Sequence, residues 1–221
     1  QELAFAARVV RHTGGRVLLF APLAVGAQTV REAEAVGLDG VRFARRPEES
    51  GTAPIVVTNY DNHDKWNPAD FAGVVADESG ILKGFEGKTR KALTGFASTI
   101  PYRLAATATP SPNDVEELGN HAEWLGVGTR VEMLSRFFVN DSSDTGTWIL
   151  KGPAIMAFWD WVASWALAAS MPSDVGPYDD SGYVLPKLHL FPHVVETNMV
   201  DGRGDGQLFA LGGISATTIH G

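Results

Sequence analysis

The sequence predicts an α/β fold in which a parallel sheet carries helices on both faces, followed by a helical C-terminal extension. Short apolar runs alternate with amphipathic helical segments through the first two-thirds of the 221 residues, as in strand–helix–strand units. These runs lack polar alternation, which is typical of strands buried on both sides. The alternation stops near Gly126, and a glycine-rich stretch begins at residue 201. We therefore expect a sheet domain over 1–125, a helical or irregular extension over 126–200 and a linker over 201–221.

The elements are predicted in order from periodicity and from start and stop signals. A helix near the N-terminus ends at Gly14-Gly15, where glycine can adopt a left-handed cap. Strands are predicted at residues 17–20, 41–43, 55–58, 74–76 and 102–105. Between them, helices are predicted at 25–36 and 88–96, and residues 44–53 are expected to form a polar loop. Ser111, followed by Pro112 and Asp114, matches a capping pattern and predicts another helix start.

Composition excludes several classes of protein. The net charge of −8 argues against a protein that coats DNA, because such proteins use many cations against phosphate. With no cysteine there are no disulfides or thiolate metal sites, which fits a reducing cytoplasm. No secretory signal is visible. The apolar stretch from Ala154 to Met171 contains Asp160 and is short for a membrane span, so we expect a buried amphipathic helix and no membrane partner.

Two polar motifs follow predicted strands and are candidates for chemistry. Asp77-Glu78 comes directly after the strand at 74–76, and adjacent carboxylates are costly to bury unless a cation or solvent compensates them. The alternative is a solvated turn. Thr107 and Thr109 follow the strand at 102–105, and a simple Thr/Pro turn is again the alternative. One strand–helix–strand unit separates the motifs, so their strands are expected to be neighbours that deliver both to one edge of the sheet.

Four segments, taken in order, resemble the first RecA-like lobe of superfamily 2 DEAD/DEAH-box helicases, which are P-loop NTPases. They are LLFAPLAVGAQT (18–29), IVVTNYD (55–61), VVADESGILK (74–83) and RLAATATPSPND (103–114). The pattern is most similar to the Swi/Snf-like branch of phage and bacterial type. ELGNHAEWLGV (117–127) also looks like that group, and the resemblance extends to about residue 190.

The resemblance implies ATP and Mg²⁺ as cofactors. Asp77 would hold Mg²⁺ and Glu78 would activate the attacking water, while Thr107 and Thr109 would link hydrolysis to movement. Ser79-Gly80 stands where the family more often has Ala-His or Ala-Asp, so the coupling to a second lobe is expected to differ in detail.

The resemblance also implies a nucleic-acid partner, double-stranded DNA, and a second RecA-like lobe. The backbone-contacting motifs of the family fall on Pro22, Leu23, Thr58 and Asn59, which would act through amides and hydroxyls. Such a motor is expected in the cytoplasm of a bacterial or phage-infected cell.

The phosphate-binding loop of the family, Gly-x-x-x-x-Gly-Lys-Ser/Thr, does not occur in the sequence. We expect it a few residues upstream of Gln1 and expect the fragment alone to be inactive. Gly87-Lys88-Thr89 imitates its end, but Leu82 occupies the position of the first glycine. The cations Lys83, Lys88, Arg90 and Lys91 are expected to line a solvated helix face, with a DNA contact as the alternative.

Two other functions remain open. One is a non-catalytic nucleic-acid or protein interaction module derived from a helicase lobe. The other is a different α/β nucleotide-dependent enzyme.

Overall fold

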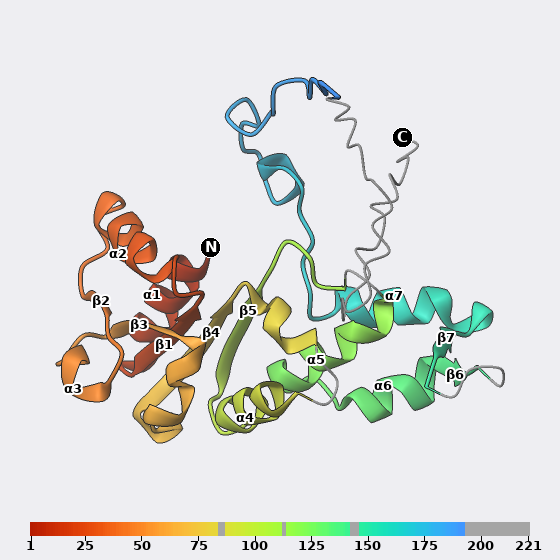
Figure 1. The fold of residues 1–221 in the computed structure, drawn as a ribbon, viewed down its shortest axis with the longest axis horizontal. Coiled ribbons are helices and arrows are strands. Elements are labelled where there is room, and N and C mark those ends of the chain that lie inside the picture. The colour runs from red at the N-terminus through yellow and green to blue at the C-terminus, as the bar shows by residue number, and fades with distance from the viewer. Residues whose placement is uncertain (84–86, 112–113, 142–145, 193–221) are drawn as a thin grey trace, which may run out of the picture. The chain divides into compact units, whose positions relative to one another are not determined.

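Five parallel strands form the central sheet in the computed structural model, which describes residues 1–83, 87–111, 114–141 and 146–192 (Figure 1). Their spatial order is β2 (Val41–Phe43), β3 (Ile55–Asn59), β1 (Arg16–Ala21), β4 (Phe71–Asp77) and β5 (Tyr102–Ala106). All five strands were predicted, and the parallel α/β class is confirmed. The chain divides into two compact units, Gln1–Leu167 and Ala168–Gly221, and the sheet belongs to the first.

Both faces of the sheet are covered by helices. In β1, Leu18 and Phe20 enter a core shared with α4 (Lys88–Ala97) and α5 (Leu118–Leu125). Val17 and Leu19 point the other way, into a core with α1 (Glu2–Thr13), and α2 (Gly26–Ala35) packs on that same side. These four β1 side chains are at most 1% exposed, and burying each stabilises the fold by about 1.5–3 kcal/mol. The continuous apolar run of β1 therefore reflects burial on two sides.

Helix α1 ends as predicted. Gly14 adopts φ 69°, in the left-handed region, and its N–H donates to the carbonyl of Val10. A left-handed residue closes the helix because it lets the chain turn while satisfying a terminal carbonyl.

Two local predictions were wrong. Residues 47–50, expected in a polar loop, form the short helix α3 (Pro47–Ser50), with proline at its favoured first position. The cap before α5 is Asp114 rather than Ser111. The Asp114 carboxylate accepts from the N–H of Glu116 and opens the 3₁₀ turn η4 (Val115–Glu117), which leads into α5. Three further 3₁₀ turns are η1 (Tyr60–Lys65), η2 (Pro68–Asp70) and η3 (Ser79–Lys83).

After α5, the first unit builds a smaller apolar core. Helix α6 (Arg130–Phe137) starts with a capping box between Thr129 and Glu132. It leads into the antiparallel hairpin of β6 (Phe138–Asn140) and β7 (Trp148–Leu150), then into η5 (Gly152–Ala154) and α7 (Ile155–Ala163). Phe158 of α7 is fully buried against Phe137 and Phe138, at ring-centroid distances of 5.5 Å.

The long buried helix expected from Ala154 to Met171 is shorter and less buried than predicted. Helix α7 ends at Ala163, and Phe158 is its one buried residue. Met156 and Trp159 are exposed because only one side of α7 packs on the small core. Within the described residues, no helix combines the length and apolarity needed to cross a bilayer. In the second unit, the described residues include the 3₁₀ turn η6 (Pro172–Asp174), whereas the expected linker at 201–221 lies outside the described part of the chain.

Candidate active site at the carboxyl edge of the sheet

The two candidate motifs emerge at the same edge of the sheet. Strand β4 ends at Asp77, which lies opposite Ala106 in the parallel register with β5. Thr107 follows Ala106 directly, so the acidic pair and the threonines leave neighbouring strands at their carboxyl ends. The strand neighbourhood expected from the sequence is confirmed. Parallel α/β sheets bind ligands at this edge, which we call the carboxyl rim.

Asp77 shares the carboxyl rim with a second acid that the sequence did not reveal. This second acid is Glu2, in the first turn of α1, and its carboxyl donates a hydrogen bond to the Asp77 carboxylate. Burial and the neighbouring Asp77 raise the pKa of Glu2 to about 7. Burial also raises the pKa of Asp77, although hydrogen bonds from Glu2 and from the N–H of Glu78 act in the opposite direction. Below about pH 7 the Glu2 carboxyl therefore keeps its proton and donates it to Asp77.

Tyr60 hydrogen-bonds to the backbone of the acidic loop, which is formed by Asp77 and Glu78. Its hydroxyl donates to the backbone carbonyl of Asp77 at 2.6 Å, and its ring stacks on Phe20 with centroids 5.6 Å apart. Burial, together with the carboxylates of Asp77, Glu2 and Glu78, raises the pKa of this phenol. The hydroxyl is therefore protonated at any physiological pH and remains a donor.

Glu78 has an unusual backbone conformation. Its φ is 50°, and it is the one non-glycine residue with positive φ in the part of the chain that is described. Such a conformation costs about 1 kcal/mol or more and persists only where surrounding contacts impose it. The side chain itself is exposed, so the carboxylate is available at the rim.

Ser79 anchors the loop on its other side. Its hydroxyl lies 3.1 Å from Nε2 of His121 in α5, and both residues are buried. Ser79 and Gly80 are the two residues at which the sequence was expected to depart from the resembling family. The sequence did not predict its partner, because 42 residues separate the two.

The threonine motif forms a tight turn. The Thr107 hydroxyl accepts a hydrogen bond from the N–H of Thr109 at 3.1 Å. Thr107 is half-buried and Thr109 is exposed, so the turn presents a free face next to the acidic loop.

The four residues predicted to touch nucleic acid lie at the same rim, where Pro22 and Leu23 follow β1 and Thr58 and Asn59 end β3, but they differ in exposure. Leu23 is 62% exposed and Pro22 is half-exposed. Asn59 is 8% exposed, and Thr58 is fully buried opposite Phe20. The Thr58 hydroxyl would reach a nucleic acid only if the rim opened.

The rim suits a metal ion better than it suits phosphates. Carboxylate oxygens are the ligands that Mg²⁺ prefers, and Mg²⁺ commonly uses one or two of them with water. Asp77 therefore fits as a ligand, although among the described residues no group of three metal-ligating side chains occurs. The phosphate-loop motif for ATP does not occur in the sequence.

The Gly87-Lys88-Thr89 motif, which imitates the end of a phosphate loop, lies at the start of α4, where Lys88 is the first helical residue. Arg90 was expected on a solvated helix face, but its side chain is buried and pairs with Glu123 at 3.1 Å.

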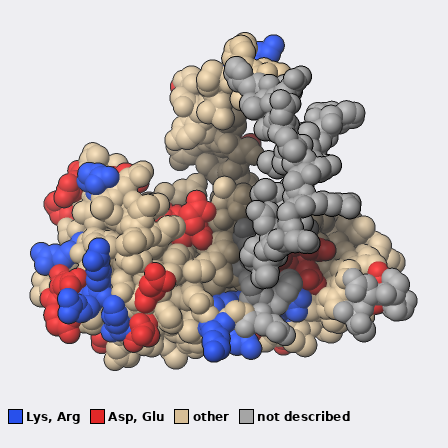
Figure 2. Space-filling view, in the orientation of Figure 1, with Lys and Arg blue, Asp and Glu red and all other residues tan. Residues whose placement is uncertain are grey.

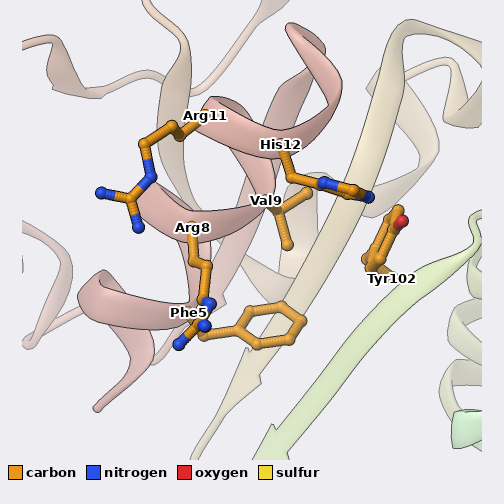
Figure 3. A pocket seen from close by; sticks show the side chains of 6 residues that line it. All are labelled: Phe5, Arg8, Val9, Arg11, His12 and Tyr102. Carbon is orange, nitrogen blue, oxygen red and sulfur yellow. The ribbon is translucent and has the colours of Figure 1, made fainter.

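A separate pocket lies away from these residues. It has a volume of about 550 Å³ and lies between α1 and the edge strand β5 (Figure 3). Its apolar floor includes Phe5 and Tyr102, and Arg8, Arg11 and His12 line its sides. Tyr102 lies at the amino end of β5, opposite Gly73, so this pocket is not part of the carboxyl rim.

The surface charge is mixed on the face seen in Figure 2, where acidic and basic side chains intermingle without a broad basic patch.

The class of site is therefore an acidic carboxyl rim on a parallel α/β sheet. No protein-family model and no curated protein matches the sequence. Among solved structures, the chain is similar to the UvsW helicase from bacteriophage T4, with 12% identity over 56% of this chain and 46% of that one, and a TM-score of 0.43. It is also similar to the Sulfolobus solfataricus SWI2/SNF2 ATPase core in complex with dsDNA, with 22% identity, 59% and 30% coverage, and a TM-score of 0.48. The chain spans less than half of either protein.

Proposed function

We propose that this chain is the ATP-binding motor lobe of an ATP-dependent DNA helicase or translocase. The observation that carries the proposal is the shared rim, where Asp77, Glu78 and Thr107 leave the adjacent strands β4 and β5. The resemblance of the four sequence segments to superfamily 2 helicases, of the Swi/Snf-like phage and bacterial type, supports the same function. In this proposal the phosphate loop and the second RecA-like lobe belong to a longer protein.

The rim residues have separate roles in this proposal. Asp77 holds Mg²⁺, which neutralises charge on the transferred phosphoryl group when it is bound. Glu78 orients the attacking water and accepts its proton. The Thr107–Thr109 turn lies beside the acidic loop and responds to the state of the nucleotide. Glu2 keeps its own proton and donates it in a hydrogen bond to Asp77 while no cation is there, because two crowded carboxyl groups resist full ionisation.

DNA contacts in this proposal are local. The net charge is −8, and the face seen in Figure 2 shows no broad cationic patch among the described residues, so backbone amides and a few side chains would bind the DNA backbone. The exposed Pro22–Leu23 turn is the most accessible candidate, with Asn59 beside it at the end of β3.

The test is DNA-stimulated ATP hydrolysis by the full-length protein. Glu78→Gln removes the general base with little change in size, and we expect a loss of about 100-fold or more in turnover. DNA binding should persist. Glu48→Gln, on the exposed surface of α3, is the matched control and should hydrolyse ATP normally. Unchanged turnover in Glu78→Gln would show that Glu78 is not the base.

The second candidate is a non-catalytic interaction module derived from a motor. This module would bind DNA or protein without any ATP hydrolysis, so the same assay on the unmodified full-length protein separates the two functions.

A further inference from the structure

Glu78 is held between two buried anchors. Its carboxylate is exposed, but the backbone that carries it has φ 50°. A glutamate with no external constraint would relax to negative φ, because the left-handed region crowds its Cβ against the backbone. The loop on either side of Glu78 must therefore supply the constraint.

The first anchor fixes the peptide that precedes Glu78. The Tyr60 hydroxyl donates to the Asp77 carbonyl at 2.6 Å. A peptide unit is planar, so this bond restrains its orientation and with it one side of the Glu78 φ rotation. Tyr60 is 7% exposed and stacked on Phe20, so its hydroxyl has little freedom to follow a moving loop.

The second anchor fixes the residue that follows. Ser79 is 0% exposed, and its hydroxyl lies 3.1 Å from Nε2 of His121. His121 is itself 4% exposed within α5, which packs on the sheet. Buried polar pairs of this kind have defined geometry because neither partner can turn to water instead.

We propose that Tyr60, Ser79 and His121 are positioning residues that hold Glu78 in its left-handed conformation and thereby aim its carboxylate. The aim of the carboxylate matters for catalysis only if the proposed ATPase function is correct. The conformational role of the two anchors does not depend on that function.

The catalytic part is tested by single-group deletions in the full-length protein. Tyr60→Phe and Ser79→Ala should each lower kcat for DNA-stimulated ATP hydrolysis about tenfold, because small misplacements of a reacting group are costly. KM for ATP should stay within about twofold, since neither residue contacts substrate. Tyr102→Phe and Ser50→Ala remove the same groups elsewhere in the sheet domain and should leave kcat unchanged.

Epistasis separates positioning from general damage. In a Glu78→Gln background, Tyr60→Phe and Ser79→Ala should cause less than about twofold further loss, because the carboxylate they aim is absent. The catalytic role would be overturned if the two substitutions lowered kcat equally in the unmodified protein and in the Glu78→Gln variant. It would also be overturned if they left kcat of the unmodified protein unchanged.

The conformational part is tested on the 221-residue chain by urea unfolding. At ordinary negative φ, alanine is more stable than glycine, whereas at positive φ the order reverses. Glu78→Gly should therefore unfold at a higher urea midpoint than Glu78→Ala. In a Tyr60→Phe/Ser79→Ala background the order should invert, because the released loop can relax.

The two failures are distinguishable. If Glu78→Ala is the more stable variant in the unmodified chain, or if the order survives release of both anchors, the anchoring proposal is wrong whatever the ATPase result. If the stability order behaves as expected but Glu78→Gln hydrolyses ATP normally, the anchors stand and the proposed function falls.

Discussion

Thr58→Val should stabilise the chain, although it changes a residue predicted to serve function. Thr58 is 0% exposed at the end of β3, and its hydroxyl has no hydrogen-bond partner among the described residues. A buried hydroxyl left unpaired costs about 1–3 kcal/mol. Valine has nearly the same shape and suits a strand, so the substitution removes that cost without opening a cavity. We expect the free energy of unfolding to rise by ~1 kcal/mol.

Urea unfolding of the 221-residue chain measures this change, with Thr29→Val as the matched control. Thr29 is 5% exposed, but its hydroxyl donates to the Val25 carbonyl at 3.2 Å, so its loss should destabilise by ~1 kcal/mol. Equal signs for the two variants, or a less stable Thr58→Val, would refute the reasoning. If Thr58 also contacts nucleic acid when the rim opens, the more stable variant should show weaker DNA stimulation in the full-length protein.

Two further predictions concern charge and backbone conformation. The raised pKa of Glu2 contributes to the free energy of unfolding. This contribution is fully present below pH 4.5 and is lost as the pH rises through about 7. The full shift corresponds to ~3 kcal/mol, and because the carboxyl is only half-buried we expect solvent screening to leave ~1 kcal/mol. Urea unfolding in EDTA should therefore give a lower free energy of unfolding at about pH 8 than at about pH 5. Glu2→Gln should make this difference smaller, and the same difference in both proteins would contradict the explanation. Gly126 has φ 78°, and an added Cβ would lie 2.6 Å from Nη1 of Arg103, so Gly126→Ala should destabilise by ~1–2 kcal/mol. Gly95→Ala has open space in the interior of α4 and should instead stabilise by ~0.5–1 kcal/mol, so similar effects at both positions would count against this explanation.

The sheet was predictable because its strands are buried on both sides. Continuous apolar runs such as Val17 to Phe20 leave little choice of structure, and the runs of β1 and β4 are followed by the helices α2 and α4, each with one apolar face. The shared end of β4 and β5 followed from the same alternation. The proposed division of the chain at residues 125 and 200 stays a prediction.

Helix α6 could have been predicted from a local signal. Thr129 and Glu132 form a complete capping box, with the Thr129 hydroxyl accepting from the N–H of Glu132 at 3.1 Å. The extent of α7 could not be read in this way. Its apolar composition continues past Ala163, but Phe158 is the one α7 side chain that is buried in the small core. Composition alone therefore overestimated both the length and the burial of this helix.

The partners of the acidic loop could not be predicted because they come from distant parts of the chain. Glu2, Tyr60 and His121 lie on three different elements, and only the packed sheet brings them to Asp77 and Ser79. An acid in the first turn of a helix usually indicates only a favourable dipole interaction. The signal at Glu2 was therefore ambiguous until its neighbour was known.

The carboxyl rim differs physically from the solvated turn that the sequence left as the alternative. In a solvated turn, acids keep ordinary pKa values and backbones relax. Here Asp77 and Glu2 have raised pKa values, Glu78 has positive φ, and Thr58 is buried without a hydrogen-bond partner among the described residues. These unfavourable features lie at the carboxyl ends of β3 and β4 and in the first turn of α1. Local conflicts that the surrounding core must offset are expected where a protein binds or reacts, so their concentration at one edge favours a functional site.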